Sequence, residues 1–148
     1  MAPPRRGRVA ATAPERVLGF SNEWYRSGIT CHGTARLPSS TRFRHIDAPH
    51  LIETELLAFA ERGEDDVLTS HDIEDIVRTV DGRASVVDEL TSAPAEVRAF
   101  VTKGLERCVE APHFLEALSG YFRDPELGEI RARGVELRLS QMIRTREI

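Results

Sequence analysis

The chain has 148 residues, of which 41% are hydrophobic and 30% charged, and its formal net charge is −4 at pH 7. This composition predicts one soluble domain with an apolar core, and no apolar run approaches the ~20 residues that a membrane span requires. The first residues include no apolar segment of the secretory type, so the cytoplasm is the expected location.

Charge is distributed unevenly along the chain. Residues 1–46 hold eight arginines and two acids, whereas residues 47–148 hold twelve basic and twenty-two acidic residues. Residues 1–16 combine arginine with proline and glycine and have no apolar periodicity, which predicts a flexible leader ahead of a single domain over 17–148. The arginine-rich N-terminus could bind nucleic acid, because cationic side chains displace counterions from phosphates.

A short helix through Trp24 and Tyr25 and then two strands are predicted before the main run of helices. The strands, over residues 30–37 and 41–46, are joined by a Pro-Ser-Ser turn, and the second alternates polar and apolar residues with a period of two. A lone two-stranded hairpin is marginal in water, so we expect it to pack on the helices or to extend a larger sheet. Its unpaired edge would accept a strand from a second copy or from a partner protein.

From Asp47 onward the pattern predicts helices. Asp47 can cap the first of them, Pro49 suits its first turn, and Gly63 would end it. Thr69 and Asp72 resemble a capping box at the start of the second helix. Apolar residues recur in both at helical spacing. They are Ile52, Leu56, Phe59 and Ala60 in the first helix and Ile73, Ile76, Val77 and Val80 in the second.

Four more helices are predicted in the second half of the chain, and Pro94, Pro112 and Pro125 mark the starts of the last three. The fold class is therefore α+β and mostly α, with a small hairpin or sheet remnant packed against the helical C-terminal region. The residues expected to point inward are Val86, Val87 and Leu90, then Val97, Phe100, Val101, Leu105 and Cys108, then Phe114, Leu115 and Leu118; in the last helix Leu127, Ile130 and Leu137 share one side.

The most distinctive stretch is acidic, with seven acids in residues 61–75. At about 100° per residue, the apolar stripe of the second helix places His71 and Asp75 on the opposite face and Asp72 at its flank. None of the three is therefore expected in the core.

In the loop before that helix, Asp65 and Asp66 could bind a hard cation through carboxylate oxygens, although a charged surface loop is commoner. A second metal hypothesis uses His50, the His71-Asp72 pair and Asp124, which match in type the ligands of an HD-type metal phosphohydrolase. In such a site imidazoles and carboxylates hold a metal that activates water. The same residues are also explained as helix starts, so both interpretations stay open.

Several short motifs occur together in residues 17–122. They are Gly19-Phe20-Ser21-Asn22, Trp24-Tyr25, Arg62-Gly63, Asp65-Asp66, Ser70-His71-Asp72, Glu74-Asp75-Ile76 and Asp81-Gly82-Arg83. In these motifs the chain resembles a family of small predicted nucleotidyltransferases related to the AbiEii-type toxin proteins. The resemblance implies a polymerase-beta-like core followed by helices, with a Gly-Ser turn for a nucleoside triphosphate and an Asp-x-Asp pair for Mg²⁺. It also implies that Asp72 and Asp75 assist catalysis and that Glu55, Arg62 and His71 occupy nucleotide-binding positions.

The chain departs from that pattern at the residues that would perform the chemistry. It contains no Gly-Ser dipeptide and no Asp-x-Asp, and Glu55 stands where the family carries a lysine. A glutamate there would repel phosphate, and at ~4 Å the change of sign amounts to several kcal/mol at an intermediate dielectric. The sequence therefore predicts a nucleotidyltransferase-like chain that is inactive alone and needs a partner chain or a further segment for its metal ligands. The alternatives are a non-catalytic interaction module, as a homodimer or with a partner protein, and the HD-type hydrolase.

Overall fold

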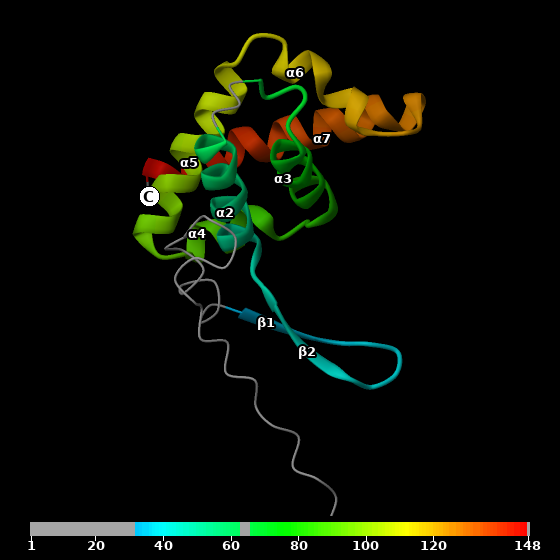
Figure 1. The fold of residues 1–148 in the computed structure, drawn as a ribbon, viewed down its shortest axis with the longest axis vertical. Helices are drawn as coiled ribbons and strands as arrows, with labels where there is room; N and C mark the ends of the chain where they lie inside the picture. Colours follow the sequence, from blue (N-terminus) through cyan, green and yellow to red (C-terminus); the bar gives the residue numbers. More distant parts are fainter. Residues whose placement is uncertain (1–31, 63–65, 148) are drawn as a thin grey trace, which may run out of the picture.

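A computed structural model describes residues 32–62 and 66–147 of the chain. The predicted leader, the helix through Trp24 and Tyr25, and the residues Gly63 and Asp65 lie outside the described residues. Within the described part, helices dominate and one small antiparallel sheet precedes them, which confirms the α+β, mostly α fold class (Figure 1). No described helix combines the length and the apolar character that crossing a lipid bilayer demands.

Strands β1 (His32–Arg36) and β2 (Arg42–Ile46) form the hairpin at the predicted position. They pair antiparallel with Ala35 opposite Phe43, and Ser40 closes the turn with a φ of 66°. The hairpin projects away from the helices instead of packing on them (Figure 1). Within the described residues it is not part of a larger sheet, and Phe43 is exposed. The expected burial of the hairpin is therefore not seen in this part of the chain.

Helices α2 (Ala48–Glu61) and α3 (His71–Gly82) follow. Asp47 caps α2 as predicted, because its carboxylate accepts a hydrogen bond from the backbone N–H of His50 at 3.0 Å. The predicted cap of α3 was wrong by one residue. Ser70, and not Thr69, accepts from the N–H of Ile73, whereas the Thr69 hydroxyl donates to Asp66.

The second half contains α4 (Val86–Ser92), α5 (Ala95–Glu110), the single-turn α6 (Phe114–Ala117), the 3₁₀ turn η1 (Leu118–Tyr121), α7 (Pro125–Arg144) and the terminal turn η2 (Thr145–Glu147). Asp124 caps α7 by accepting from the N–H groups of Glu126 and Leu127, as expected. Leu115 does not point inward as predicted and is 36% exposed. Because α6 is only one turn long, it buries Phe114 and leaves the next side chain outside.

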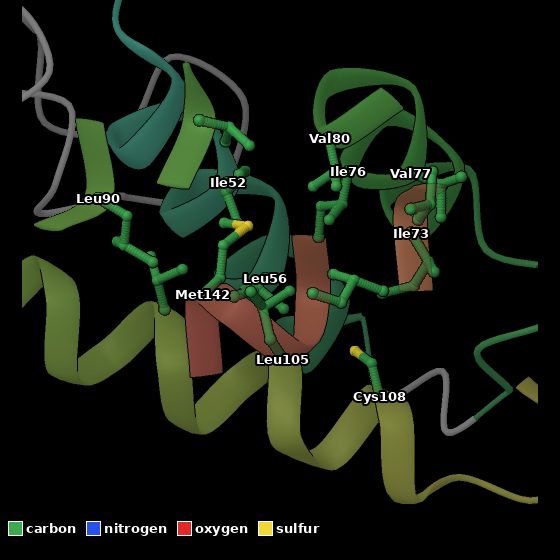
Figure 2. Close-up of a cluster of buried hydrophobic side chains, with 14 of the residues drawn as sticks. Ile52, Leu56, Ile73, Ile76, Val77, Val80, Leu90, Leu105, Cys108 and Met142 are labelled. Carbon is green, nitrogen blue, oxygen red and sulfur yellow. The ribbon is translucent and has the colours of Figure 1, made fainter. Parts of the chain in front are cut away.

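The core lies where α2, α3, α5 and α7 meet, as Figure 2 shows. Leu56 of α2 lies directly over Gly104 of α5, where an added Cβ would stand 2.6 Å from the nearest Leu56 methyl group. The absence of a side chain at Gly104 therefore lets the two helices approach closely. The buried residues that α2 and α3 contribute include Ile52, Leu56, Ile73, Ile76, Val77 and Val80.

Helix α7 has two apolar stripes that face opposite directions. The buried stripe is made of Gly128, Ala132, Val135, Leu139 and Met142. Leu127, Ile130 and Leu137 do share one side, as predicted, but that side is turned to solvent.

Two arginines of α7 lie between its two apolar stripes and bind the end of α3. Arg131 Nε donates to Asp81 Oδ2 at 3.0 Å, and Arg138 donates to the carbonyls of Val80 and Asp81.

Candidate functional site: the acidic face of helices α2 and α3

The structure brings four predicted site residues together across the contact between α2 and α3. Glu55 lies on α2, Arg62 follows its last turn, and Asp72 and Asp75 lie on the first two turns of α3. Arg62 Nη1 and Asp72 Oδ1 form an ion pair at 3.0 Å. Glu55 lies within electrostatic reach of all three. Four of the residues that the sequence resemblance singled out therefore form one ionic cluster.

Asp72 is only 4% exposed, so the prediction that it lies outside the core was wrong. Periodicity placed it at the flank of the α3 stripe, and α2 together with Arg62 covers that flank. One carboxylate oxygen is bound by Arg62, whereas the other meets no donor among the described residues and lies on the side of Glu55. A buried carboxylate is stable there only because it has a cation beside it. The cation that neutralises Asp72 therefore comes from its own chain and not from a ligand.

Glu55 lies in a negative electrostatic potential that two neighbouring carboxylates create. Burial, followed by the charges of Asp72 and Asp75, raises the pKa of the Glu55 carboxyl, and the Arg62 charge acts in the opposite direction. Protonation is favoured because ionisation would add a charge beside two carboxylates. An incoming phosphate would meet the same potential. This part of the α2–α3 face therefore favours cations and protons over nucleotide phosphates.

His71 and Asp75 point outward from α3, as the periodicity predicted. His71 is 91% exposed, and its Nδ1 lies 3.3 Å from the carboxylate of Glu74. Arg78 binds Glu74 at 2.5 Å and lies 3.7 Å from Asp75. These are exposed pairs one helical turn apart, of the kind that contributes little to stability. Asp75 is therefore accessible to solvent at the outer edge of the cluster.

The loop acid Asp66 is occupied by its own backbone and a neighbour. Its carboxylate accepts from the N–H of Leu68 at 2.9 Å and from the Thr69 hydroxyl at 3.3 Å. This is the turn-forming role that aspartate commonly plays in loops. The structure therefore gives Asp66 a structural role, and its predicted neighbour Asp65 lies outside the described residues.

The residues of the HD-type hypothesis are distributed over three helix starts. His50 is 1% exposed with its Nδ1 2.7 Å from Asp47, His71 is in solvent, and Asp124 caps α7. Across residues 32–62 and 66–147, no three histidine, cysteine, aspartate or glutamate side chains are placed to hold one metal ion. The described residues thus do not assemble the metal site that this hypothesis requires.

Sequence reasoning missed a pocket of about 480 Å³ between α2 and α5. Its walls are mostly apolar, with Lys103 and Arg107 as the cations among its lining residues. Cys108 also lines it, and burial raises the pKa of this thiol to about 11, so the thiol is unreactive near neutral pH. In the sequence the only trace of this pocket is that Lys103 and Arg107 lie next to the apolar stripe of α5. Helical periodicity alone does not distinguish such a pocket from an ordinary contact between helices.

Comparison of the chain with protein-family models, with curated proteins and with solved structures found no match. The resemblance to nucleotidyltransferases thus remains a prediction from the motifs quoted above. Function is argued below from those motifs and from the contacts of the α2–α3 face.

Proposed function

We propose that this chain is a nucleotidyltransferase-like protein, related to the AbiEii-type toxins, that does not transfer nucleotides by itself. The observation that carries the proposal is the ion pair between Arg62 and Asp72. The first residue stands at a nucleotide-binding position of the resemblance and the second at a catalytic one. In this chain they neutralise each other at 3.0 Å, and the carboxylate is buried.

Mg²⁺ and a nucleoside triphosphate are the cofactor and substrate that the resemblance implies. Mg²⁺ demands near-octahedral oxygen ligands, usually one or two carboxylates together with substrate phosphates. One oxygen of Asp72 is already paired with Arg62, and Asp75 faces solvent. The pKa of Glu55 is raised, which favours its neutral form over the charged form that binds a metal ion. These residues do not fit a Mg²⁺–triphosphate site by themselves. An active enzyme would need carboxylates from a partner chain or from a further segment.

The direct test is label transfer. The purified chain is incubated with Mg²⁺, each labelled nucleoside triphosphate and mixed RNA, and incorporation into RNA and protein is counted. We expect background incorporation only. Incorporation well above background that disappears in Asp72→Ala would overturn the proposal. Asp88→Ala is the matched control, because Asp88 is an exposed acid in the first turn of α4 that is not among the charges acting on Glu55.

A binding measurement tests the electrostatic reason for inactivity. We expect Glu55→Lys to bind Mg²⁺-ATP more tightly than the wild-type chain, with Glu55→Gln in between, because each change removes negative charge from this face. Fluorescent ATP titrated into the three proteins gives the order of affinities. The opposite order, with the wild-type chain tightest, would show that Glu55 contributes to a nucleotide site instead of opposing one.

A second candidate function is a non-catalytic interaction module. Two observations favour it: the exposed apolar stripe on α7 and the hairpin that projects from the helices (Figure 1). Exposed apolar side chains gathered on one face commonly mark a binding surface. A pull-down with the wild-type chain tests it, and failure to retain a second copy or any other protein would count against it.

A further inference from the structure

The pocket between α2 and α5 has the size of a site for a small molecule. Its volume of about 480 Å³ falls within the ~300–1,000 Å³ that is usual for ligand-binding cavities. Leu56 and Cys108, both labelled in Figure 2, form part of its wall. The two helices already touch where Leu56 lies over Gly104, so they cannot move closer at this point. The space beside that contact is therefore part of the fold itself, and we refer to it as the α2–α5 pocket.

The walls of the α2–α5 pocket offer almost no hydrogen-bond partners to the body of a ligand. Apart from Lys103, Arg107 and the thiol of Cys108, none of its lining residues has a polar side chain. The backbone N–H and C=O groups inside a helix bond to one another. A nucleotide or a sugar would bury hydroxyl and base groups there without partners, which costs free energy. The body of a fitting ligand is therefore hydrocarbon.

The two cations of the pocket lie one helical turn apart on the same side of α5. Lys103 and Arg107 are both exposed, and across the described residues neither forms an ion pair or a side-chain hydrogen bond. Their neighbour Glu106 is bound by Arg146 at 3.1 Å instead. Like charges one turn apart repel and slightly destabilise a helix. An anion placed beside both would remove that repulsion.

We propose that the α2–α5 pocket binds a monocarboxylate with a hydrocarbon chain, a ligand of the fatty-acid class. The chain lies along the apolar walls, and the carboxylate binds at Lys103 and Arg107. The planar guanidinium of an arginine matches a carboxylate with two parallel hydrogen bonds, and a lysine adds a compact positive charge. The 148 residues include one lysine, and it lines this pocket.

This site is separate from the one on which the proposed function rests. None of its lining residues belongs to the ionic cluster of Glu55, Arg62, Asp72 and Asp75. The inference therefore does not depend on whether the chain transfers nucleotides.

The first test compares head groups on one hydrocarbon chain. Decanoate, decan-1-ol and decyltrimethylammonium are titrated separately into the full chain by isothermal calorimetry. We expect saturable binding of one decanoate per chain, and binding at least tenfold weaker for the alcohol and the ammonium compound, because only decanoate carries the anion. Hexanoate should also bind more weakly than decanoate, since it buries less apolar surface.

The second test removes each cation. Lys103→Met and Arg107→Met keep an apolar stem and should each weaken decanoate binding by about tenfold, because each deletes a charged hydrogen-bond donor. Their affinity for decan-1-ol should not change. Arg133→Met is the matched control, because it removes the same charge from an exposed arginine of α7 that does not line the pocket.

The third test fills the pocket. Ala60→Trp places an indole at an exposed residue of the lining and should abolish decanoate binding. Ala99→Trp, at an exposed alanine of α5 outside the lining, should bind decanoate like the wild-type chain. Circular dichroism checks that the helices form, and the head-group comparison stands even if Ala60→Trp does not fold.

The single lysine gives a direct reading of where the ligand binds. Acetic anhydride acetylates amines, and peptide mass spectrometry follows Lys103 and the α-amino group of the chain separately. Saturating decanoate should slow acetylation of Lys103 at least tenfold and leave the rate at the α-amino group unchanged. Equal rates at Lys103 with and without decanoate would place the ligand elsewhere and overturn the proposal.

Three other results would also overturn the proposal. One is a wild-type chain without saturable binding, as expected if another segment of the chain or a second protein fills the pocket. Another is equal affinity for decanoate and decan-1-ol. The third is a loss in Arg133→Met as large as that in Arg107→Met, which would indicate attraction by overall charge. Each would leave the label-transfer result unaffected, so failures of the two proposals are distinguishable.

Discussion

Helices α3 and α7 both bury one apolar stripe, but their outer faces differ in kind. The outer face of α3 carries Glu74 and Asp75, each of which pairs with Arg78 at helical spacing. The outer face of α7 carries Ile130 and Leu137 in solvent. The charges on the outer face of α3 are therefore paired within one chain, whereas the apolar residues on the outer face of α7 are not covered by any residue that the structure describes.

This difference shows that burial in one chain does not follow from apolar character alone. On α3 the only apolar stripe is the one that packs. On α7 the residues that pack include Gly128 and Ala132, which are smaller than the exposed Leu127 and Ile130. Small residues allow α7 to lie close against η1 and α3. The larger ones are free for contacts with another molecule.

The largest expected effect separates the two faces of α7. Leu139→Ala should lower the free energy of unfolding by about 2–5 kcal/mol, because Leu139 is 1% exposed and its removal leaves a cavity. Leu137→Ala should change it by less than about 0.5 kcal/mol when the chain is monomeric. Urea unfolding at about 1 μM protein measures both. Equal losses would mean that the outer face of α7 is packed within the single chain.

The next effect concerns the edge of α3 that α2 covers. Arg62→Ala should lower the free energy of unfolding by about 1–2 kcal/mol near pH 7, because Asp72 would remain buried beside Glu55 without its cation. This is below the loss expected for a fully buried pair, since Arg62 is 56% exposed. The loss should shrink in acid, where carboxylates take up protons. A loss that is constant from pH 4 to pH 8 would contradict the electrostatic explanation.

Glu55→Gln should stabilise the protein near neutral pH, by no more than about 1 kcal/mol because the group is partly exposed. The pKa of Glu55 is raised above its ordinary value of 4.5 on folding, so the folded state holds the proton more tightly than the unfolded state. Stability of the wild-type chain therefore falls as pH rises from 4.5 through the raised pKa. The advantage of Gln should vanish below pH 4.5. Paired urea titrations at pH 4 and pH 7 measure it, with the exposed Glu129→Gln as control.

The smallest effect is expected on the outer face of α3. Arg78→Ala removes exposed pairs with Glu74 and Asp75 and should change the free energy of unfolding by less than about 0.5 kcal/mol. The same urea assay used for Arg62→Ala provides the comparison. A loss as large as that of Arg62→Ala would show that the outer face of α3 depends on its charges more than its exposure suggests.

The helices and the hairpin were predictable from sequence because period and capping residues are local signals. Asp47, Pro49 and Asp124 mark helix starts whatever surrounds them. The α3 stripe was identified correctly because its apolar residues are all on one side. Placing the cap of α3 at Thr69 failed because two hydroxyl residues are adjacent, and only the backbone path decides which one meets the N–H of Ile73.

The candidate site was predictable as a set of residues but not as a set of contacts. Motif resemblance selected Glu55, Arg62, His71, Asp72 and Asp75, and the structure brings all of them except the exposed His71 to one contact between helices. Helical periodicity considers α3 without its neighbours, so it did not predict that α2 covers Asp72. It likewise could not choose between the two stripes of α7. Both failures have one cause, since burial depends on which neighbour lies against a helix.

Arg131 and Arg138 agree with the buried stripe in the rotational setting of α7. If the helix turned about its axis by half a revolution, Val135, Leu139 and Met142 would leave the interior, and larger side chains would meet the close contact that Gly128 makes with Ser119. Such a turn would carry both guanidinium groups away from Asp81 and the carbonyls at the end of α3. Directional polar bonds and the close contact at Gly128 thus select the same rotation of the helix.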